Sequence, residues 1–265
     1  MTVPFVKAHG ARNDFLLTWS AGAPAADHAE VARAICDRTA GIGADGWILV
    51  TPPAAGQPAA IRLLNSDGSA SEISGNGTRC AAALLVDAGL ADGEFEIQTG
   101  AGPKRLRLLA RDGIRFEFEM HMGTPRVLST DLETLNVPPA PVRGLAIDVG
   151  NPQFAVPVED FDFDWRAAGA AIERHPRFPQ RTNVSFLRKV DAHTIEVRFF
   201  ERGAGETASS GTGSTGAVAA AMHLGWSGSP VTVLTPAGPL PVRDAGGLYL
   251  TGPAVLIGSG DFYYF

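Results

Sequence analysis

The feature that most constrains the fold is an internal repeat at about half of the chain length. The segment 74–83, SGNGTRCAAA, returns as SGTGSTGAVA at 210–219, which is an offset of 136 residues. A second pair of segments, beginning at Asn13 (NDF) and Asn151 (NPQF), lies 138 residues apart. A motif that recurs at a fixed offset indicates a repeated structural unit. We therefore expect two pseudo-symmetric halves, at 1–115 with 252–265 and at 116–251.

Local patterns place these halves in the α/β (α+β) class, with strands predominating. Short runs of β-branched and aromatic residues, bounded by Gly, Pro, Asp or Asn, recur along the whole chain. Four stretches favour helices instead, at 26–40, 77–88, 165–174 and 214–224. The stretches at 77–88 and 214–224 are alanine-rich and apolar nearly all round, which is typical of buried helices. We expect strands to wrap around one central apolar helix in each half.

The repeated Ser-Gly-X-Gly turns stand where the two buried helices are expected to begin. The first turn of a helix presents unpaired N–H groups and the positive end of the helix dipole, so it can bind an anion. Ser74 and Ser210 would then flank a carboxylate in a cleft between the halves. Alternatively, both serines only cap their helices. The matched pair leaves the two interpretations about equally supported.

Two further segments bear on the kind of ligand. Segment 41–46 (GIGADG) fits the dinucleotide pattern G-x-G-x-x-G, but it follows a predicted helix and precedes a strand, which is the reverse of the required order. Segment 201–207 (ERGAGET) places two carboxylates and an arginine just before Ser210. This composition favours a pocket in which Arg202 binds a carboxylate and Glu201 or Glu206 binds an ammonium group.

Composition and charge limit the classes of binding partner and the cellular location that we expect for the chain. The formal net charge of the 265-residue chain is −6, and no basic run occurs, so we expect neither nucleic-acid nor membrane binding. Neither a signal peptide nor a membrane-spanning run is evident, which makes a cytoplasmic location the default. The only two cysteines, Cys36 and Cys80, predict no disulfide framework, and the spacing of the histidines predicts no metal site. We interpret Cys80 as a buried apolar residue.

Six blocks follow one another along the chain: 9–15 (HGARNDF), 65–69 (NSDGS), 74–80 (SGNGTRC), 150–152 (GNP), 182–184 (TNV) and 201–207 (ERGAGET) followed by 210–213 (SGTG). In this order they resemble the diaminopimelate epimerases. The resemblance implies two similar halves with the active site between them, and catalysis without cofactor or metal. It also implies an isomerase of the lysine and cell-wall precursor pathway that acts on LL- and meso-diaminopimelate. The expected binding partner is this small amino acid. Assembly of the chain as a homodimer is a further possibility.

The resemblance further implies a role for individual residues. In the family, one cysteine thiolate removes the α-proton and the opposite cysteine thiol returns a proton to the other face. The implied catalytic positions here are Ser74, Ser210, Glu201 and Gln153. The implied substrate-binding positions are Asn13, Asn65, Gly75, Asn76, Asn151, Asn183, Arg202, Gly211 and Thr212.

The sequence departs from the family at the positions of proton transfer. Serine occupies both cysteine positions, and Gln153 occupies the position of a histidine that assists the first cysteine, whereas Glu201 is retained. Arg12 also replaces a glycine. If the pKa of the serine alcohol lies ~4 units above that of a thiol, forming the alkoxide costs about 5 kcal/mol more than forming the thiolate. Such a difference would slow proton abstraction on the order of 10³–10⁴-fold. Because the histidine is missing too, natural divergence is favoured over deliberate replacement of the cysteines.

Three hypotheses of different classes follow. The first is a two-base epimerase or racemase of an amino acid, which we adopt as the single best function. The second is a one-base lyase or isomerase on the same scaffold, in which Glu201 activates Ser210. The third is a catalytically silent homologue that binds an amino acid.

Overall fold

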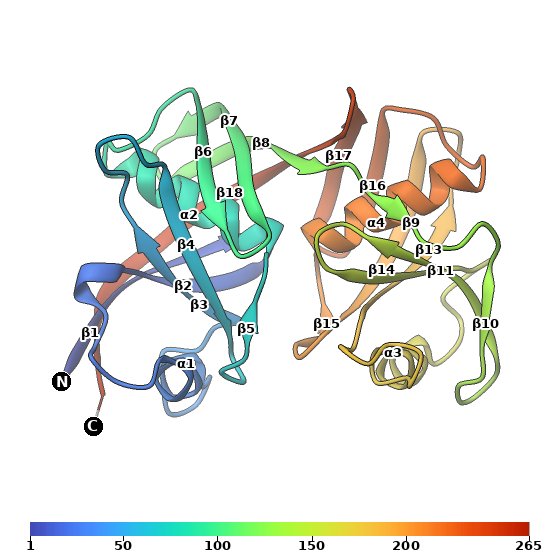
Figure 1. The fold of residues 1–265 in the computed structure, drawn as a ribbon, viewed down its shortest axis with the longest axis horizontal. Helices are drawn as coiled ribbons and strands as arrows, with labels where there is room; N and C mark the ends of the chain where they lie inside the picture. Colours follow the sequence, from blue (N-terminus) through green and yellow to red (C-terminus); the bar gives the residue numbers. More distant parts are fainter. Residues whose placement is uncertain (265) are drawn as a thin grey trace. The chain divides into compact units, whose positions relative to one another are not determined.

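A computed structural model describes residues 1–264 of the chain, which form two compact units (Figure 1). Unit 1 comprises Met1–His121 together with the segment that begins at Thr251, and unit 2 comprises Met122–Leu250. The sequence placed this division after residue 115 and the return to the first half at residue 252. Phe265, at the end of the predicted returning segment, lies outside the described residues.

Unit 1 is a closed barrel of eight strands. The eight are β1 (Thr2–Gly10), β2 (Asn13–Trp19), β3 (Gly46–Thr51), β4 (Ala59–Asn65), β6 (Glu94–Thr99), β7 (Gly102–Asp112), β8 (Arg115–Gly123) and most of β18 (Leu248–Tyr263), and the two-residue strand β5 (Ala70–Ser71) is additional to them. Neighbouring strands follow the order β18, β1, β2, β3, β4, β6, β7, β8 and return to β18, while β5 pairs with β4. The pairs β2–β3 and β4–β6 are parallel.

Unit 2 repeats this order of strands. It contains β9 (Arg126–Val127), β10 (Glu133–Leu135), β11 (Val142–Asp148), β12 (Pro152–Pro157), β13 (Asn183–Lys189), β14 (Thr194–Glu201), β15 (Gly205–Thr207), β16 (Val231–Thr235), β17 (Gly238–Asp244) and the first residues of β18. The pairs β12–β13 and β14–β16 are parallel, at the places of β2–β3 and β4–β6. The internal repeat that the sequence predicted is therefore confirmed in the topology.

One helix in each unit is central. The helix α2 (Gly75–Asp87) packs against β1 to β4, and α4 (Gly211–His223) packs against β11 to β14. Figure 1 shows both helices surrounded by the strands of their own unit. Because both helices are rich in alanine and glycine, their backbones can pack closely against these strands. Nearly every residue of both helices is buried. The expected central apolar helices are thus present.

The other helices lie on the outside of each unit's strands. These are α1 (His28–Cys36), α3 (Trp165–Glu173) and the short 3₁₀ helix η1 (Ser20–Gly22). The helix α1 is shorter than the predicted 26–40, because Asp27 caps its start with a 2.9 Å bond from the Ala29 N–H and Asp37 is already extended. No helix within residues 1–264 is long and apolar enough to cross a membrane.

The repeat extends to individual turns. After β6, Thr99 Oγ1 donates to the carbonyl of Gly102 at 2.7 Å, and after β16, Thr235 Oγ1 donates to the carbonyl of Gly238 at 2.7 Å. Both threonine hydroxyls also accept an N–H two residues later, at 3.2 Å in each case. The offset between these turns is again 136 residues. The two units therefore match residue by residue from β4 and β14 to the turns that lead into β7 and β17.

Candidate active site

The two repeated serines are the N-caps of the central helices. Ser74 has φ −128° and ψ 121°, and Ser210 has φ −136° and ψ 123°. Ser74 Oγ accepts the N–H of Gly77 at 3.1 Å, and Ser210 Oγ accepts the N–H of Gly213 at 3.0 Å. Capping uses a lone pair of the oxygen and leaves the hydroxyl proton available for donation. The capping interpretation is therefore correct for the geometry, and it is compatible with a chemical role.

Capping serines also correct the predicted starts of the two helices. The sequence placed these starts at 77 and 214, whereas the helices begin at Gly75 and Gly211. Glycine has a low intrinsic helix propensity, so the apolar pattern alone placed both starts too late. As a consequence, Gly75, Asn76, Gly211 and Thr212 belong to the first helical turns, where backbone N–H groups have no intrahelical acceptor.

Ser210 lies beside a carboxylate within unit 2. Its hydroxyl, only 2% exposed, donates a short hydrogen bond to Oε1 of Glu201 at the end of β14. The second acidic residue of this segment, Glu206, instead forms an ion pair with the guanidinium of Arg166, with N–O distances of 2.5 and 2.9 Å. Of the two carboxylates that the sequence offered, Glu201 is the one placed to accept the Ser210 proton.

The equivalent position in unit 1 carries an amide. Cross-strand partners Leu63 and Ser71 correspond to Phe199 and Thr207 at the repeat offset, which makes Asn65 the counterpart of Glu201. The Asn65 side chain donates from Nδ2 to Ser69 Oγ at 3.0 Å. An amide is no base near neutrality, so the two N-cap serines differ in their chemical surroundings. Sequence analysis missed this correspondence, although the repeat offset contained it.

The predicted ligands Asn13 and Asn76 meet in unit 1. Asn76 Nδ2 donates to Asn13 Oδ1 at 3.4 Å, and both side chains are buried. Asn13 Nδ2 in turn donates to Oδ2 of Asp45 at 2.6 Å. Gly10 allows this meeting, because a Cβ at that position would come within 2.9 Å of the Asn76 carbonyl oxygen.

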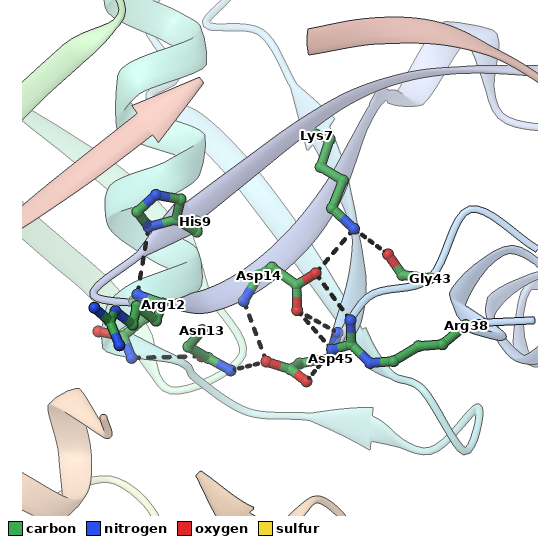
Figure 2. A network of polar contacts seen from close by, with 9 residues as sticks. Lys7, His9, Arg12, Asn13, Asp14, Arg38, Gly43 and Asp45 are labelled. Carbon is green, nitrogen blue, oxygen red and sulfur yellow. Dashed lines mark hydrogen bonds and ion pairs between the residues drawn. The ribbon is translucent and has the colours of Figure 1, made fainter. Parts of the chain in front are cut away.

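A charged network lies beside Asn13 (Figure 2). Arg38 bridges Asp14 and Asp45, with N–O distances of 2.8 Å to each, and Lys7 contacts Asp14 at 2.9 Å. Burial opposes ionisation of Asp14, but the hydrogen bonds from Arg38 and Lys7 outweigh it and hold its pKa below the usual value. Burial, followed by the charge of Asp14, raises the pKa of Asp45. Sequence analysis had no signal for this network, because its members are distant in the chain.

The predicted polar residues of unit 2 form a second cluster. Gln153 Nε2 donates to Asn151 Oδ1 at 2.8 Å, and both residues are buried. Asn183 donates to the carbonyl of Pro152 at 3.0 Å and accepts the backbone N–H of Arg202 at 3.0 Å. The Gln153 side chain also packs on α4, where a Cβ at Gly216 would lie 3.3 Å from its Cβ and Cγ.

The structure also bears on Cys80, on Arg12 and on metal binding. Burial raises the pKa of the Cys80 thiol to about 12, so this fully buried cysteine stays protonated and is no displaced nucleophile. Arg12, at φ 64°, lies in the β1–β2 turn, in the left-handed region that glycine adopts more readily. Within the described part of the chain, no group of three or more His, Cys, Asp or Glu side chains could hold a metal ion.

Comparison with known proteins identifies relatives over nearly the whole chain. The family model described as diaminopimelate epimerase matches residues 5–128 and 145–257. A diaminopimelate epimerase of Pelotomaculum thermopropionicum is 36% identical over 98% of this chain and 99% of its own length. One from Moorella thermoacetica is 37% identical over 97% of this chain and 98% of its own length.

Solved structures share the fold. A hydroxyproline epimerase from Agrobacterium vitis has a TM-score of 0.80 at 17% identity, and the match covers 98% of this chain and 92% of that one. A methylitaconate-delta-isomerase has a TM-score of 0.63 at 14% identity, covering 98% of this chain and 95% of that one. The two-unit architecture with a central helix in each unit therefore occurs in these isomerases.

Proposed function

The chain belongs to the diaminopimelate epimerase family, and from this membership we propose that it inverts the configuration at Cα of diaminopimelate, between the LL and meso forms, without a cofactor. The observation that carries the proposal is the pair of matched Ser-Gly-X-Gly turns, each opening a buried helix of 13 residues. Backbone N–H groups at these turns suit the carboxylate of an amino acid, including the negative charge that develops on it when the α-proton leaves.

We assign one proton-transfer group to each face of Cα. On one face, Ser210 Oγ takes the α-proton while its own proton passes to Glu201, so that no free alkoxide accumulates. On the other face, Ser74 gives its proton to Cα while a solvent water replaces that proton, and Glu201 then releases its own proton to solvent; in the reverse direction each of these transfers is reversed. Because Asn65 stands where a carboxylate would assist, this second transfer is the slow one, and we expect a lower rate than a thiol pair would give.

Roles for the other polar residues complete the proposal. Asn13, Asn65, Asn76, Asn151, Asn183 and Arg202 would hold the carboxylates and amino groups of the substrate, with Gly75, Gly211 and Thr212 contributing backbone N–H groups. Gln153 would orient the substrate, because its amide cannot exchange a proton usefully near neutrality. A cytoplasmic location and assembly as a homodimer belong to the same proposal.

The asymmetry of the two units favours a second candidate function. Ser210 has a carboxylate partner and Ser74 has none within the described residues, which suits a one-base isomerase or lyase. Such an enzyme would use Ser210 and Glu201 to move a proton on one face only. In that case Ser74→Ala would retain activity, whereas Glu201→Gln would abolish it.

Isotope exchange at Cα tests the proposal. The protein is incubated with LL-diaminopimelate in D₂O, and both deuterium incorporation and formation of the meso isomer are followed by NMR. We expect both to occur. Deuterium incorporation without inversion would support the one-base alternative, and no exchange on diaminopimelate or on a panel of amino acids would contradict the proposal.

A matched variant separates a slow enzyme from a silent binder. Ser74→Cys/Ser210→Cys/Gln153→His introduces the groups that the family resemblance implies. If this variant exchanges deuterium and the unchanged chain only shows ligand-induced thermal stabilisation, the chain is a catalytically silent amino-acid-binding homologue. If both exchange, with the variant on the order of 10³ faster, the serine pair is a functional but weaker acid–base pair.

A further inference from the structure

We propose that Arg79 and Asp45 are positioning residues that fix the side-chain amides of Asn13 and Asn76 in a single orientation for the substrate. This inference rests on the proposed function, which gives the two amides their purpose. Neither Arg79 nor Asp45 emerged from the sequence as a site residue. Arg79 is the largest charged side chain that unit 1 buries completely.

Arg79 lies within α2 and has no exposed surface. Its guanidinium donates to three neutral oxygens: Asn76 Oδ1 at 2.5 Å, the Gly75 carbonyl at 3.3 Å and the Pro253 carbonyl at 3.2 Å. No carboxylate within residues 1–264 forms an ion pair with it. Burial lowers the pKa of Arg79 to about 10, so the group remains charged at neutral pH. A buried cation without a counter-ion is costly, and hydrogen bonds such as these three must offset the cost of its desolvation.

The chain makes room for this cation on β18. A Cβ at Gly252 would come within 2.9 Å of both Cζ and Nη2 of Arg79. Glycine at this position therefore lets the guanidinium lie flat against the strand, beside the Pro253 carbonyl that it contacts. The placement of Arg79 is thus built from two distant segments, α2 and β18.

Hydrogen bonds connect Arg79 to Asp45 in one direction. Arg79 donates to Asn76, Asn76 donates to Asn13, and Asn13 donates to Asp45. A guanidinium can only donate and a carboxylate can only accept. With these two groups at the ends, each asparagine must turn its oxygen towards Arg79 and its nitrogen towards Asp45. Flipping either amide would set two donors or two acceptors against each other.

The four residues Arg79, Asn76, Asn13 and Asp45 thus form a hydrogen-bond relay, and further contacts hold its members in place. Asp45 accepts the backbone N–H of Asp14 at 3.1 Å and contacts Arg38 at 2.8 Å, so its carboxylate cannot rotate freely (Figure 2). Asn76 belongs to the first turn of α2, directly after Ser74 and Gly75. The relay therefore defines which polar atoms this turn presents, and the charge of Arg79 further favours an anionic ligand there.

Two measurements test the relay. In protein labelled with ¹⁵N-asparagine, the side-chain amides of Asn13 and Asn76, assigned from Asn13→Ser and Asn76→Ser, should exchange slowly with solvent. We expect Arg79→Met, Asp45→Asn and Gly252→Ala each to speed this exchange at least tenfold. The same three variants should raise KM for diaminopimelate by about 10- to 100-fold, with kcat changed less than fivefold.

Controls separate positioning from general damage. Arg111→Met removes an exposed arginine that pairs with Asp87 at the end of α2, and it should leave both readouts unchanged. If Arg79→Met does not fold, Gly252→Ala and Asp45→Asn retain the guanidinium and carry the test. Unchanged amide exchange in these folded variants would overturn the proposal. If the unchanged chain has no activity on diaminopimelate, the proposed function fails. The amide exchange rates still show whether Arg79 and Asp45 hold the amides of Asn13 and Asn76.

Discussion

At the scale of single residues, Ser210 combines two hydrogen-bonding roles. Its oxygen accepts the Gly213 N–H at the start of α4, while its proton is donated to Glu201. The two roles use different parts of the hydroxyl group, so the helix cap also holds the oxygen in the orientation that proton transfer requires. Within residues 1–264, Ser74 has the first role only, and Asn65 occupies the place of the carboxylate.

Glu201→Gln should abolish most of the Cα exchange while leaving the fold intact. The glutamine oxygen can still accept the Ser210 hydroxyl, so we expect the free energy of unfolding to change by about 1 kcal/mol or less. Without a base, the exchange rate should fall on the order of 10²–10⁴. Glu206→Gln is the matched control, because Glu206 belongs to the same hairpin and pairs with Arg166 at the surface. Equal rates in the two variants would exclude Glu201 as the base.

Residue-level prediction from the sequence succeeded where the internal repeat supplied a pattern. Ser74 and Ser210 were found as paired helix-opening residues because the same turn occurs twice. Asp45 and Arg79 were not singled out from the sequence for a physical reason. Their contacts with Asn13 and Asn76 arise only on folding, and a lone aspartate or an arginine within a helix has no distinguishing local pattern.

At the scale of elements, the first turn of α2 has both a structural and a binding task, and Ser74 variants should separate them. Ser74→Ala removes the acceptor for the Gly77 N–H and should cost about 1 kcal/mol in the free energy of unfolding. Ser74→Asp keeps a capping acceptor and should remain as stable as the unchanged chain. Its negative charge, however, should repel a carboxylate at the same turn.

Urea unfolding and ligand-induced thermal shifts measure the two tasks separately. We expect Ser74→Ala to lose stability and Ser74→Asp to lose the thermal shift caused by diaminopimelate. A normal thermal shift in Ser74→Asp would mean that no carboxylate binds near this turn. A drop in stability for Ser74→Asp equal to that of Ser74→Ala would show that the cap tolerates only serine.

Element prediction was most accurate for the longest patterned segments. Both central helices were found, since their apolar residues continue over about three turns. The strands β5, β9, β10 and β15 cannot be predicted from alternation, because each has only two or three residues. In β17, Pro239 and Pro241 weaken the strand pattern.

At the scale of the whole molecule, unit 1 is completed by the end of the chain. The strand β18 pairs with β1 from Thr2–Tyr263 to His9–Val255, and it also pairs with β8 to close the barrel. Ala254 and Leu256 are buried in it, and the Pro253 carbonyl accepts from Arg79. The sequence analysis assigned residues 252–265 to the first half. The closure of the barrel depends on pairings that no local pattern reveals.

Deleting residues 251–265 should therefore unfold unit 1 and leave unit 2 folded. Removing β18 exposes the edges of β1 and β8 and deprives Arg79 of one of its three acceptors. Hydrogen exchange followed by mass spectrometry should show lost protection in α2 and retained protection in α4. A synthetic peptide of residues 251–264, added in trans, should restore protection in α2, whereas a scrambled peptide should not. Protection of α2 that survives the deletion would mean that the barrel is stable without its closing strand.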